Sequence, residues 1–331
     1  MEFTRQCSKE QVVRMEGNIL IDPDNIKRIA REQGLPAGII EKDYAITILL
    51  VILCELPFIN RMAFKGGTAI KKIYFPEARF SEDLDFTCYE DISKTLIEHL
   101  ERAIKGRNWL GVRFTEVGLE ETGPNSARVV VQYLDFNDHP NRINLDLSMR
   151  ERPVLKTGLK RMPNDYNIGK EVTCSYLHFY SFDDLSKVKQ CRCELRGGPS
   201  FASKLGCFTC EDFTYDPAIE PNDILKAVYV RTMELNEILA EKVRALLRIE
   251  RPRHLYDIWF LLDKGAKINL RLVNEKLKLY NEKFQIENMK KAISELKDAW
   301  ERDLKPLIAK AEVPSISSVE KQVTEAFQAI K

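Results

Sequence analysis

The sequence predicts an α+β fold with a mixed β-sheet core and a C-terminal helical domain. Strand-like alternation recurs over 83–147, after helical patterns near the N-terminus. Beyond Pro221 the apolar residues take the 3.6-residue period of long helices. A chain of 331 residues also has material for more than one domain. We therefore expect N-terminal helices over 1–60, a sheet core over 61–220 with a cysteine-rich insertion near 174–215, and a helical domain over 221–331.

Caps and apolar spacing define the predicted helices. Asp22 as N-cap and Pro23 in the first turn indicate a helix that ends at Gly34. A second helix is expected from Gly38 to just before Pro57. Its uncharged run over 45–54 is shorter than the roughly 20 residues that span a bilayer, so we interpret it as a buried helix. Further helices are expected over 68–74, 92–105 and 235–249, through the series Met289, Ile293, Leu296, Trp300 and Leu304, and from a capping box at 317–320 toward Ile330.

Alternating stretches bounded by Gly, Pro and Asn predict the strands. They lie over 112–117, 127–134 and 143–147, and we expect them to join a strand at 83–86 in one mixed sheet. The net charge of +1 excludes wholesale electrostatic wrapping of nucleic acid, although a charged fraction of 31% allows local basic patches. The N-terminus lacks the pattern of a secretory signal, so a cytoplasmic protein without a membrane segment is expected.

A pair of aspartates, Asp83 and Asp85, is the first candidate for chemistry. Residues i and i+2 of a strand point to the same face, so the two carboxylates repel unless a proton or a cation lies between them. Magnesium prefers one or two carboxylates plus phosphate oxygens, and the preceding Gly66-Gly67 pair lets backbone N–H groups approach phosphates closely. The combination predicts phosphoryl or nucleotidyl transfer. The alternative for the Asp-x-Asp pattern alone is a solvated acidic strand edge.

Asp146, in a predicted neighbouring strand, is the candidate for a third acid. It would act as a metal ligand or as a general base. With two metal ions, one would lower the pKa of an acceptor hydroxyl and the other would clamp the β- and γ-phosphates.

A lysine on an apolar helix face is the second candidate. On a projection at about 100° per residue, Lys242 falls among the leucines and isoleucines of 235–249. Such an ammonium is paired, extends outward, or points into a ligand cavity, and the upstream phosphate candidate favours triphosphate binding. Arg248, Arg251 and Arg253 follow as a basic rim for phosphates or as a solvated face. Asp257 would pair with Arg253 or Lys242 and orient it, or form a purely structural ion pair.

In sequence order, these motifs resemble those of the AbiEii/AbiGii toxin family of type IV toxin–antitoxin systems, which has the nucleotidyltransferase fold. The matching segments are Glu41-Lys42-Asp43-Tyr44, 64–69, 79–86, 144–146, 240–246 and 253–258. The resemblance implies transfer of a nucleotide from an NTP, with magnesium or manganese, to an acceptor that is tRNA in some relatives. A cognate antitoxin encoded nearby is a further implied partner.

The resemblance also implies roles for individual residues. Asp83, Asp85, Asp146, Lys242 and Asp257 form the expected catalytic set, with the metal on Asp83, Asp85 and Asp146. The expected nucleotide-binding set is Lys65, Gly66, Gly67, Thr68, Lys71, Ser81, Lys242 and Arg253. The chain departs from the family where Arg253-His254 replaces the usual Arg-Asp, which leaves the residue that deprotonates the acceptor open. The segment between the glycine pair and Asp83 is also longer than in the general nucleotidyltransferase pattern.

Four of the eight cysteines form a separate candidate site. Cys191 and Cys193 precede a Gly-Gly-Pro loop that Cys207 and Cys210 follow, a layout that suits a structural zinc ion held by four thiolates. Free thiols in a reducing cytosol are the alternative. His99, His139 and His178 lack ligand spacing and are expected at the surface or in hydrogen bonds, whereas Trp259 and Trp300 lie on apolar helix stripes and are expected in the core.

Two other functions remain open at the level of sequence. One is an enzyme that transfers a nucleotide to a protein or a small molecule. The other is a binding protein that holds a nucleotide without turnover and contacts RNA or protein through the cysteine module.

Overall fold

The computed structural model describes residues 23–109, 111–123, 125–163, 166, 228–309 and 313–330. The predicted cysteine-rich insertion near 174–215 lies outside the described residues, together with His178. The zinc site that we expect at Cys191, Cys193, Cys207 and Cys210 therefore stays a prediction.

A mixed sheet forms the core of the described chain and confirms the predicted α+β fold. Its seven strands lie in the order β3 (Arg113–Gly123), β4 (Ser126–Leu134), β5 (Pro140–Ser148), β2 (Asp83–Cys88), β1 (Met62–Lys65), β7 (Tyr229–Thr232) and β6 (Gly158–Arg161). β2 is parallel to β5 and β1 is parallel to β7, whereas the other neighbouring strands are antiparallel. β3 is longer than the sequence predicted, because its pairing with β4 continues to Gly123 across two irregularities. The central position of β2 and β5 places the candidate aspartates in the middle of the sheet.

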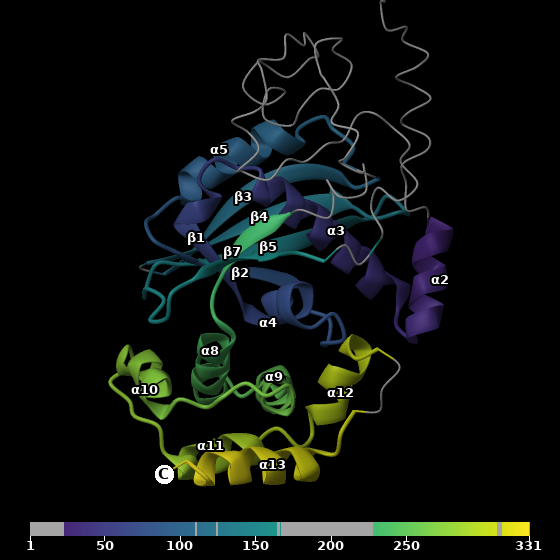
Figure 1. Cartoon of the computed structure of the whole chain (residues 1–331). Coiled ribbons are helices and arrows are strands. Elements are labelled where there is room, and N and C mark those ends of the chain that lie inside the picture. The colour runs from purple at the N-terminus through teal and green to yellow at the C-terminus, as the bar shows by residue number, and fades with distance from the viewer. Residues whose placement is uncertain are drawn as a thin grey trace, which may run out of the picture.

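Helices from the N-terminal part of the chain flank this sheet (Figure 1). α2 (Pro23–Gln33) packs on α3 (Ala37–Cys54), and α5 (Ser93–Ile104) packs on β3 and β4. A short turn, η1 (Ile59–Arg61), leads into β1, and α4 (Gly66–Ala69) follows that strand and continues as η2 (Ile70–Tyr74). The predicted buried helix is confirmed, since nearly all residues of α3 from Ile40 onward are buried. Within the described ranges, no helix combines the length and the apolar character needed to cross a membrane.

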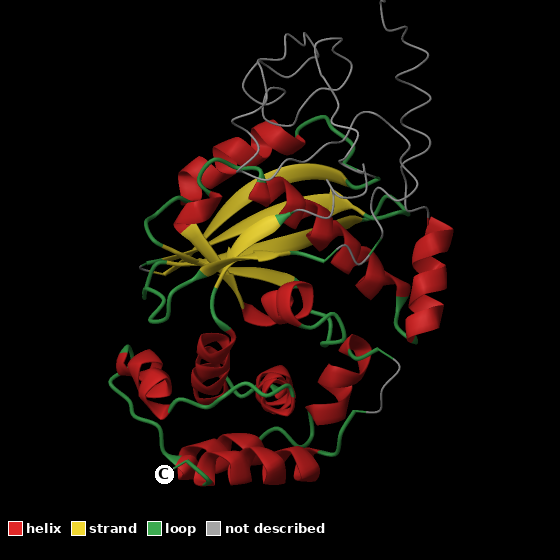
Figure 2. Cartoon of the chain, viewed as in Figure 1, coloured by secondary structure: helices red, strands yellow, loops and turns green. Residues whose placement is uncertain are grey.

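The predicted C-terminal helices form a group on the side of the sheet that carries α4 (Figures 1 and 2). They are α8 (Leu235–Arg248), α9 (Pro252–Asp263), α10 (Leu270–Lys278), α11 (Ile286–Ser294), α12 (Trp300–Leu304), the short η4 (Lys305–Leu307) and α13 (Ile316–Gln328). α8 packs against both α9 and α10. β7 leads directly into this group, and the Met233 N–H donates to the Phe64 carbonyl at 3.0 Å. The sheet thus takes a strand from beyond Pro221, just before the helices begin.

Two local predictions differ from the structure. The last helix begins at Ile316, and its N-cap is Ser315, whose hydroxyl accepts from the Ser318 N–H at 3.3 Å. The capping box expected at 317–320 therefore lies inside the helix. The apolar series from Met289 to Leu304 is buried as expected. It does not form one helix, since turns separate α11 from α12.

Candidate active site

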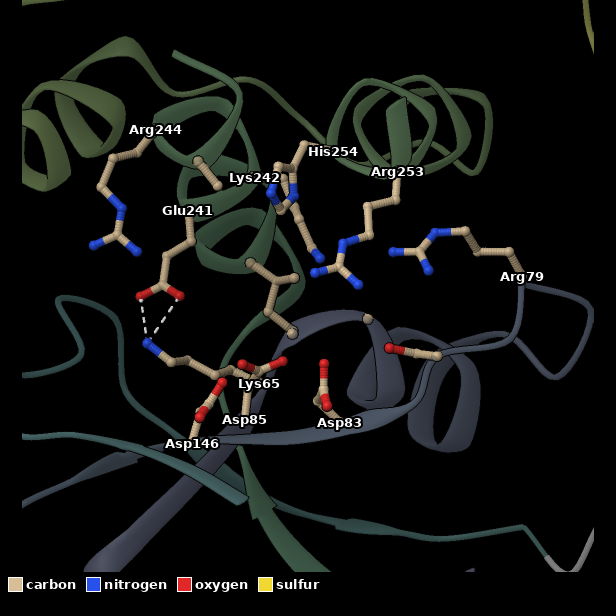
Figure 3. A pocket seen from close by; sticks show the side chains of 15 residues that line it. Lys65, Arg79, Asp83, Asp85, Asp146, Glu241, Lys242, Arg244, Arg253 and His254 are labelled. Carbon is tan, nitrogen blue, oxygen red and sulfur yellow. Dashed lines mark hydrogen bonds and ion pairs between the residues drawn. The ribbon is translucent and has the colours of Figure 1, made fainter. Parts of the chain in front are cut away.

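Three aspartates form the floor of a cavity of about 180 Å³ between the sheet and α8 and α9 (Figure 3). β2 and β5 run parallel in a register that places Asp83 opposite Asn144 and Asp85 opposite Asp146. Side chains alternate along a strand, so Asp83 and Asp85 share one face, and the pairing brings Asp146 to the same face. Sheet geometry alone therefore collects three carboxylates that lie up to 63 positions apart in the chain.

The three carboxylates differ in their surroundings. Asp146 accepts two hydrogen bonds from Arg128, at 2.7 Å from Nε and 3.1 Å from Nη2. Asp83 accepts one hydrogen bond from Nδ2 of Asn144, at 3.0 Å. Burial raises the pKa of Asp85 to about 6, with Asp146 and Asp83 acting in the same direction and Lys242 and Lys65 partly opposing them. A bound cation would favour the charged form of Asp85.

A divalent cation fits this floor when its remaining ligands come from outside the protein. Within the described ranges, no group of three or more His, Cys, Asp or Glu side chains is arranged as a complete metal site. Asp83, Asp85 and Asp146 stay the candidate ligands, and Arg128 already uses one lone pair on each oxygen of Asp146. Magnesium commonly binds one or two carboxylates together with substrate phosphates, and the charge repulsion at Asp85 suits such an ion.

The glycine pair closes one side of the floor. Gly66 has a φ of +78°, and a Cβ there would lie 2.0 Å from Oδ2 of Asp85. A Cβ on Gly67 would lie 2.8 Å from Oγ of Ser81. Both positions need glycine because side chains from β2 and the preceding loop come up to the backbone. Lys65, Gly66, Gly67 and Ser81, which the sequence analysis assigned to the nucleotide-binding set, line the cavity.

Thr68 and Lys71 lie away from the cavity lining. Thr68 Oγ1 donates to the Asp83 carbonyl at 2.5 Å and so fixes the start of β2. The Lys71 ammonium donates to the carbonyls of Pro76 and Ala78, at 2.8 and 3.2 Å, and lies over the Phe80 ring. We therefore assign these two side chains to the support of the loop before β2 and leave them out of the proposed nucleotide site.

Cationic side chains form the opposite wall (Figure 3). Lys242 comes from α8, Arg253 from the first turn of α9, and Arg79 from the loop between η2 and β2. The extra length of that loop, which the sequence showed only as a long gap before Asp83, brings Arg79 to this wall. Burial lowers the pKa of Arg253, as do its neighbours Arg79 and Arg251, while Asp83 and Asp85 raise it.

Asp257 anchors this wall. Its carboxylate lies 2.7 Å from Nζ of Lys242 and accepts from both Nε and Nη2 of Arg79 at 2.7 Å. Burial alone would raise the pKa of Asp257, but Arg79 and Lys242 outweigh it and hold the pKa at about 2. The predicted pairing with Lys242 is present in the structure, whereas the partner arginine is Arg79 instead of Arg253. An aspartate held in this way orients cations, and it is a poor proton acceptor.

Sequence reasoning missed a second group of charges beside the cavity. Glu241 and Arg244 of α8 line the cavity together with Lys65. Glu241 lies 3.1 Å from Lys65 Nζ and 3.3 Å from Lys276 Nζ. Burial would raise the pKa of Glu241, but Lys65, Arg244 and Lys276 together lower it to about 2. α8 carries two glutamates beside three basic residues, and its sequence does not show which lysine of another element meets Glu241.

The segment Glu41-Lys42-Asp43-Tyr44 of the family resemblance supports the fold outside the cavity. Glu41 accepts from the Phe136 N–H at 2.6 Å, and Asp43 pairs with the buried Lys72 at 2.5 Å.

Comparison with known proteins identifies the family of this chain. Residues 48–179 and 204–329, more than half of the chain, match the family described as "Nucleotidyl transferase AbiEii toxin, Type IV TA system". The chain belongs to this family. The expected resemblance is thus confirmed, and the protein is an NTP-dependent nucleotidyltransferase of the AbiEii toxin family. A search among curated protein sequences found no match.

A solved structure of a nucleotidyltransferase toxin has a similar fold. The chain is similar to MenT4, a nucleotidyltransferase toxin from Mycobacterium tuberculosis, with 17% identity and a TM-score of 0.53 over 93% of this chain and 88% of MenT4. It also matches JHP933 from Helicobacter pylori, with 16% identity and a TM-score of 0.45 over 85% of this chain and 88% of JHP933. At such identities the first likeness concerns the fold alone.

Proposed function

We propose that this AbiEii protein transfers a nucleotide from an NTP to an acceptor hydroxyl in a reaction that depends on magnesium or manganese. One observation carries the proposal: a floor with Asp83 and Asp85 faces a wall with Lys242 and Arg253 across a cavity of about 180 Å³. A nucleoside triphosphate with its metal ion needs both kinds of surface, carboxylates for the cation and basic side chains for the phosphates.

In this proposal, different residues bind the cation and the phosphates. Asp83 and Asp85 would hold the cation, which when bound neutralises phosphate charge and favours deprotonation of the acceptor hydroxyl. Lys242 and Arg253 bind the phosphates and stabilise charge that develops on the leaving pyrophosphate. Backbone N–H groups at Gly66 and Gly67 provide a further surface for phosphate oxygens.

Lys65, Ser81 and Asp146 complete the proposed site. Lys65 and Ser81 lie at the edge of the cavity as additional phosphate contacts. Asp146 shares the floor, and Arg128 donates one hydrogen bond to each of its carboxylate oxygens, so a role as base or metal ligand would use the lone pairs that these bonds leave. Asp257 is assigned to positioning Lys242.

The acceptor proposed first is tRNA, the class that the family resemblance implies. The test incubates the protein with each labelled NTP, total tRNA and magnesium, and follows the label on RNA. Asp83→Asn and Asp85→Asn are each expected to reduce transfer at least 100-fold, because each removes a carboxylate from the proposed cation site. Chelation of the divalent ion is expected to have the same effect.

An exposed aspartate provides the matched control. Asp298→Asn makes the same chemical change on the surface of the helical part and is expected to keep wild-type transfer. Undiminished transfer by the floor variants, with all variants folded, would contradict the proposed roles of Asp83 and Asp85.

Other acceptors and a non-catalytic role are outcomes of the same assay. Label that survives ribonuclease and stays with protein or small molecules would favour nucleotidylation of those acceptors. NTP binding without label transfer to any acceptor would favour a nucleotide-binding protein. We also propose an antitoxin as protein partner, because the family belongs to type IV toxin–antitoxin systems.

A further inference from the structure

A histidine in the cationic wall has an unsatisfied nitrogen. His254 lies in the first turn of α9, and its partly exposed ring lines the cavity beside Lys242 and Arg253 (Figure 3). Nδ1 of His254 is buried and has no hydrogen-bond partner among the described residues. Buried polar atoms in folded proteins nearly always have a partner, so an orphan atom in a cavity wall points to a missing ligand or proton.

Burial and the cations around the ring keep it neutral in the free protein. Lys242 on α8, Arg253 on α9 and Arg79 on the loop before β2 are cations that lower the pKa of the ring, and Asp257, which raises it, is paired with Lys242 and Arg79. Glu241 on α8 and the floor aspartates on β2 and β5 line the same cavity. Burial, with Lys242 next in size, lowers the pKa of His254 to about 2. The wall therefore contains a neutral imidazole among positive charges.

A polyphosphate would reverse this balance. Its negative charges would lie against Lys242 and Arg253 and offset the repulsion that these cations exert on an imidazolium. A charged imidazole can also donate from both ring nitrogens, whereas a neutral one donates from a single nitrogen. Hydrogen bonds from a charged donor to phosphate are about twice as strong as neutral ones.

We propose that His254 takes up one proton from solvent when a polyphosphate enters the cavity, and that the imidazolium then donates a hydrogen bond to a phosphate oxygen. The inference rests on the proposed NTP site. His254 stands where the family usually has aspartate. The proposed binding role is one that an aspartate cannot fill, since a carboxylate repels phosphate. Nucleotide binding by this chain is then coupled to pH, and the bound state carries the extra proton.

The test uses inorganic tripolyphosphate, which probes the phosphate site without a base or an acceptor. Calorimetric titrations in buffers of different ionisation enthalpy give the number of protons taken up per ligand bound. Wild type is expected to take up close to one proton more than His254→Gln at the same pH. Its affinity is also expected to fall more steeply than that of the variant as pH rises, because the proton favours the bound state.

Another histidine serves as the control. His139→Gln removes an exposed histidine outside the cavity lining and is expected to keep the proton uptake of wild type. Equal proton uptake and equal pH dependence in wild type and His254→Gln would overturn the proposal.

A measurement on the unmodified protein covers the case in which His254→Gln does not fold. The chain has only four histidines, so their imidazole signals can be followed by NMR. One of them is expected to stay neutral between about pH 5 and pH 8 in the free protein and to titrate in that range with tripolyphosphate bound. A ring that stays neutral with the ligand bound would overturn the proposal.

The outcomes separate this inference from the proposed transfer reaction. Absence of tripolyphosphate binding, or binding without proton uptake, rejects the role of His254. Label transfer to an acceptor would still stand in either case, because that assay reports on the reaction itself.

Discussion

The Asp85 carboxylate lies on the cavity floor with two other aspartates on the same sheet face, and its environment opposes its charge. Its pKa in the folded protein is about 6, above the ordinary value of 3.8. The folded state therefore holds the proton more tightly than the unfolded state between these values. Stability from this group is present at low pH and is lost as pH rises through about 6. The proposed metal site is thus maintained at the expense of stability at neutral pH.

Asp85→Asn is accordingly expected to stabilise the metal-free protein at pH 7.5. The gain is on the order of 3 kcal/mol, since the pKa shift is about two units and one unit corresponds to about 1.4 kcal/mol, and it is expected to shrink near pH 4. Urea unfolding with a chelator present measures it at both pH values. Asp298→Asn is the exposed control, with an expected change within about 0.5 kcal/mol. A variant that is no more stable than wild type at pH 7.5 would show that burial does not oppose the charge of Asp85.

Single residues also show how far sequence reasoning reaches. Asp83 and Asp85 could be placed on one face from a two-residue period, and Lys242 stood out on a helical projection, because local geometry determines both patterns. The register of β2 against β5, which brings Asp146 to the same face, is not local and could not be predicted in this way. Arg79 and Glu241 could not be placed in the same way. Their roles depend on contacts with partners 178 and 176 positions away, and many arginines and glutamates in this sequence have the same local pattern.

At the scale of elements, the Asp257 carboxylate connects α9 to α8 and to the loop before β2. It bonds Arg79 and Lys242 at once, and all three side chains are almost fully buried. These contacts set where the cationic wall stands relative to the sheet. Helix positions from sequence were close to those observed, but the orientation of α8 against α9 depends on this contact, which no periodicity predicts.

Asp257→Asn is expected to lower the free energy of unfolding by about 3–5 kcal/mol, because it leaves two buried cations without an anion. Nucleotide transfer is expected to fall as well, since Lys242 loses its positioning partner. Denaturant unfolding and the labelled-NTP assay measure the two effects.

The matched control breaks a solvent-exposed ion pair in the same helical part of the chain. Glu282→Gln removes the partner of Arg248, where both side chains are about 40% exposed, and is expected to cost at most about 1 kcal/mol. If the two substitutions had equal effects, the buried contact would not be what holds the wall in place.

Across the whole molecule, a buried chain of charges joins the helical group to the sheet. Lys276 on α10, fully buried, lies 2.6 Å from Glu237 and 3.3 Å from Glu241 on α8. Glu237 also accepts from the Val154 and Leu155 N–H groups at 2.7 and 2.8 Å, after β5. The connection reaches the cavity, because Glu241 also pairs with Lys65 at the end of β1.

Lys276→Met is expected to destabilise the protein by about 3–5 kcal/mol, because several buried carboxylates would lose their shared cation. Lys278→Met makes the same change two residues later on α10, at a side chain that is 78% exposed, and is expected to change stability by no more than about 0.5 kcal/mol. Urea unfolding measures both. Similar stability of the two variants would mean that the apolar contacts between α8 and α10 suffice without the charges.

The distance along the chain between the two sides of the cavity has a consequence for synthesis. Asp83 and Asp85 leave the ribosome early, but Arg79 meets Asp257 only after 178 further residues have been added. A chain that stops before α8 contains the acidic floor without Lys242 or Arg253 opposite it. We therefore expect premature termination or proteolytic removal of the C-terminal helices to yield fragments with no activity, so that only a cell that completes the chain has a working enzyme.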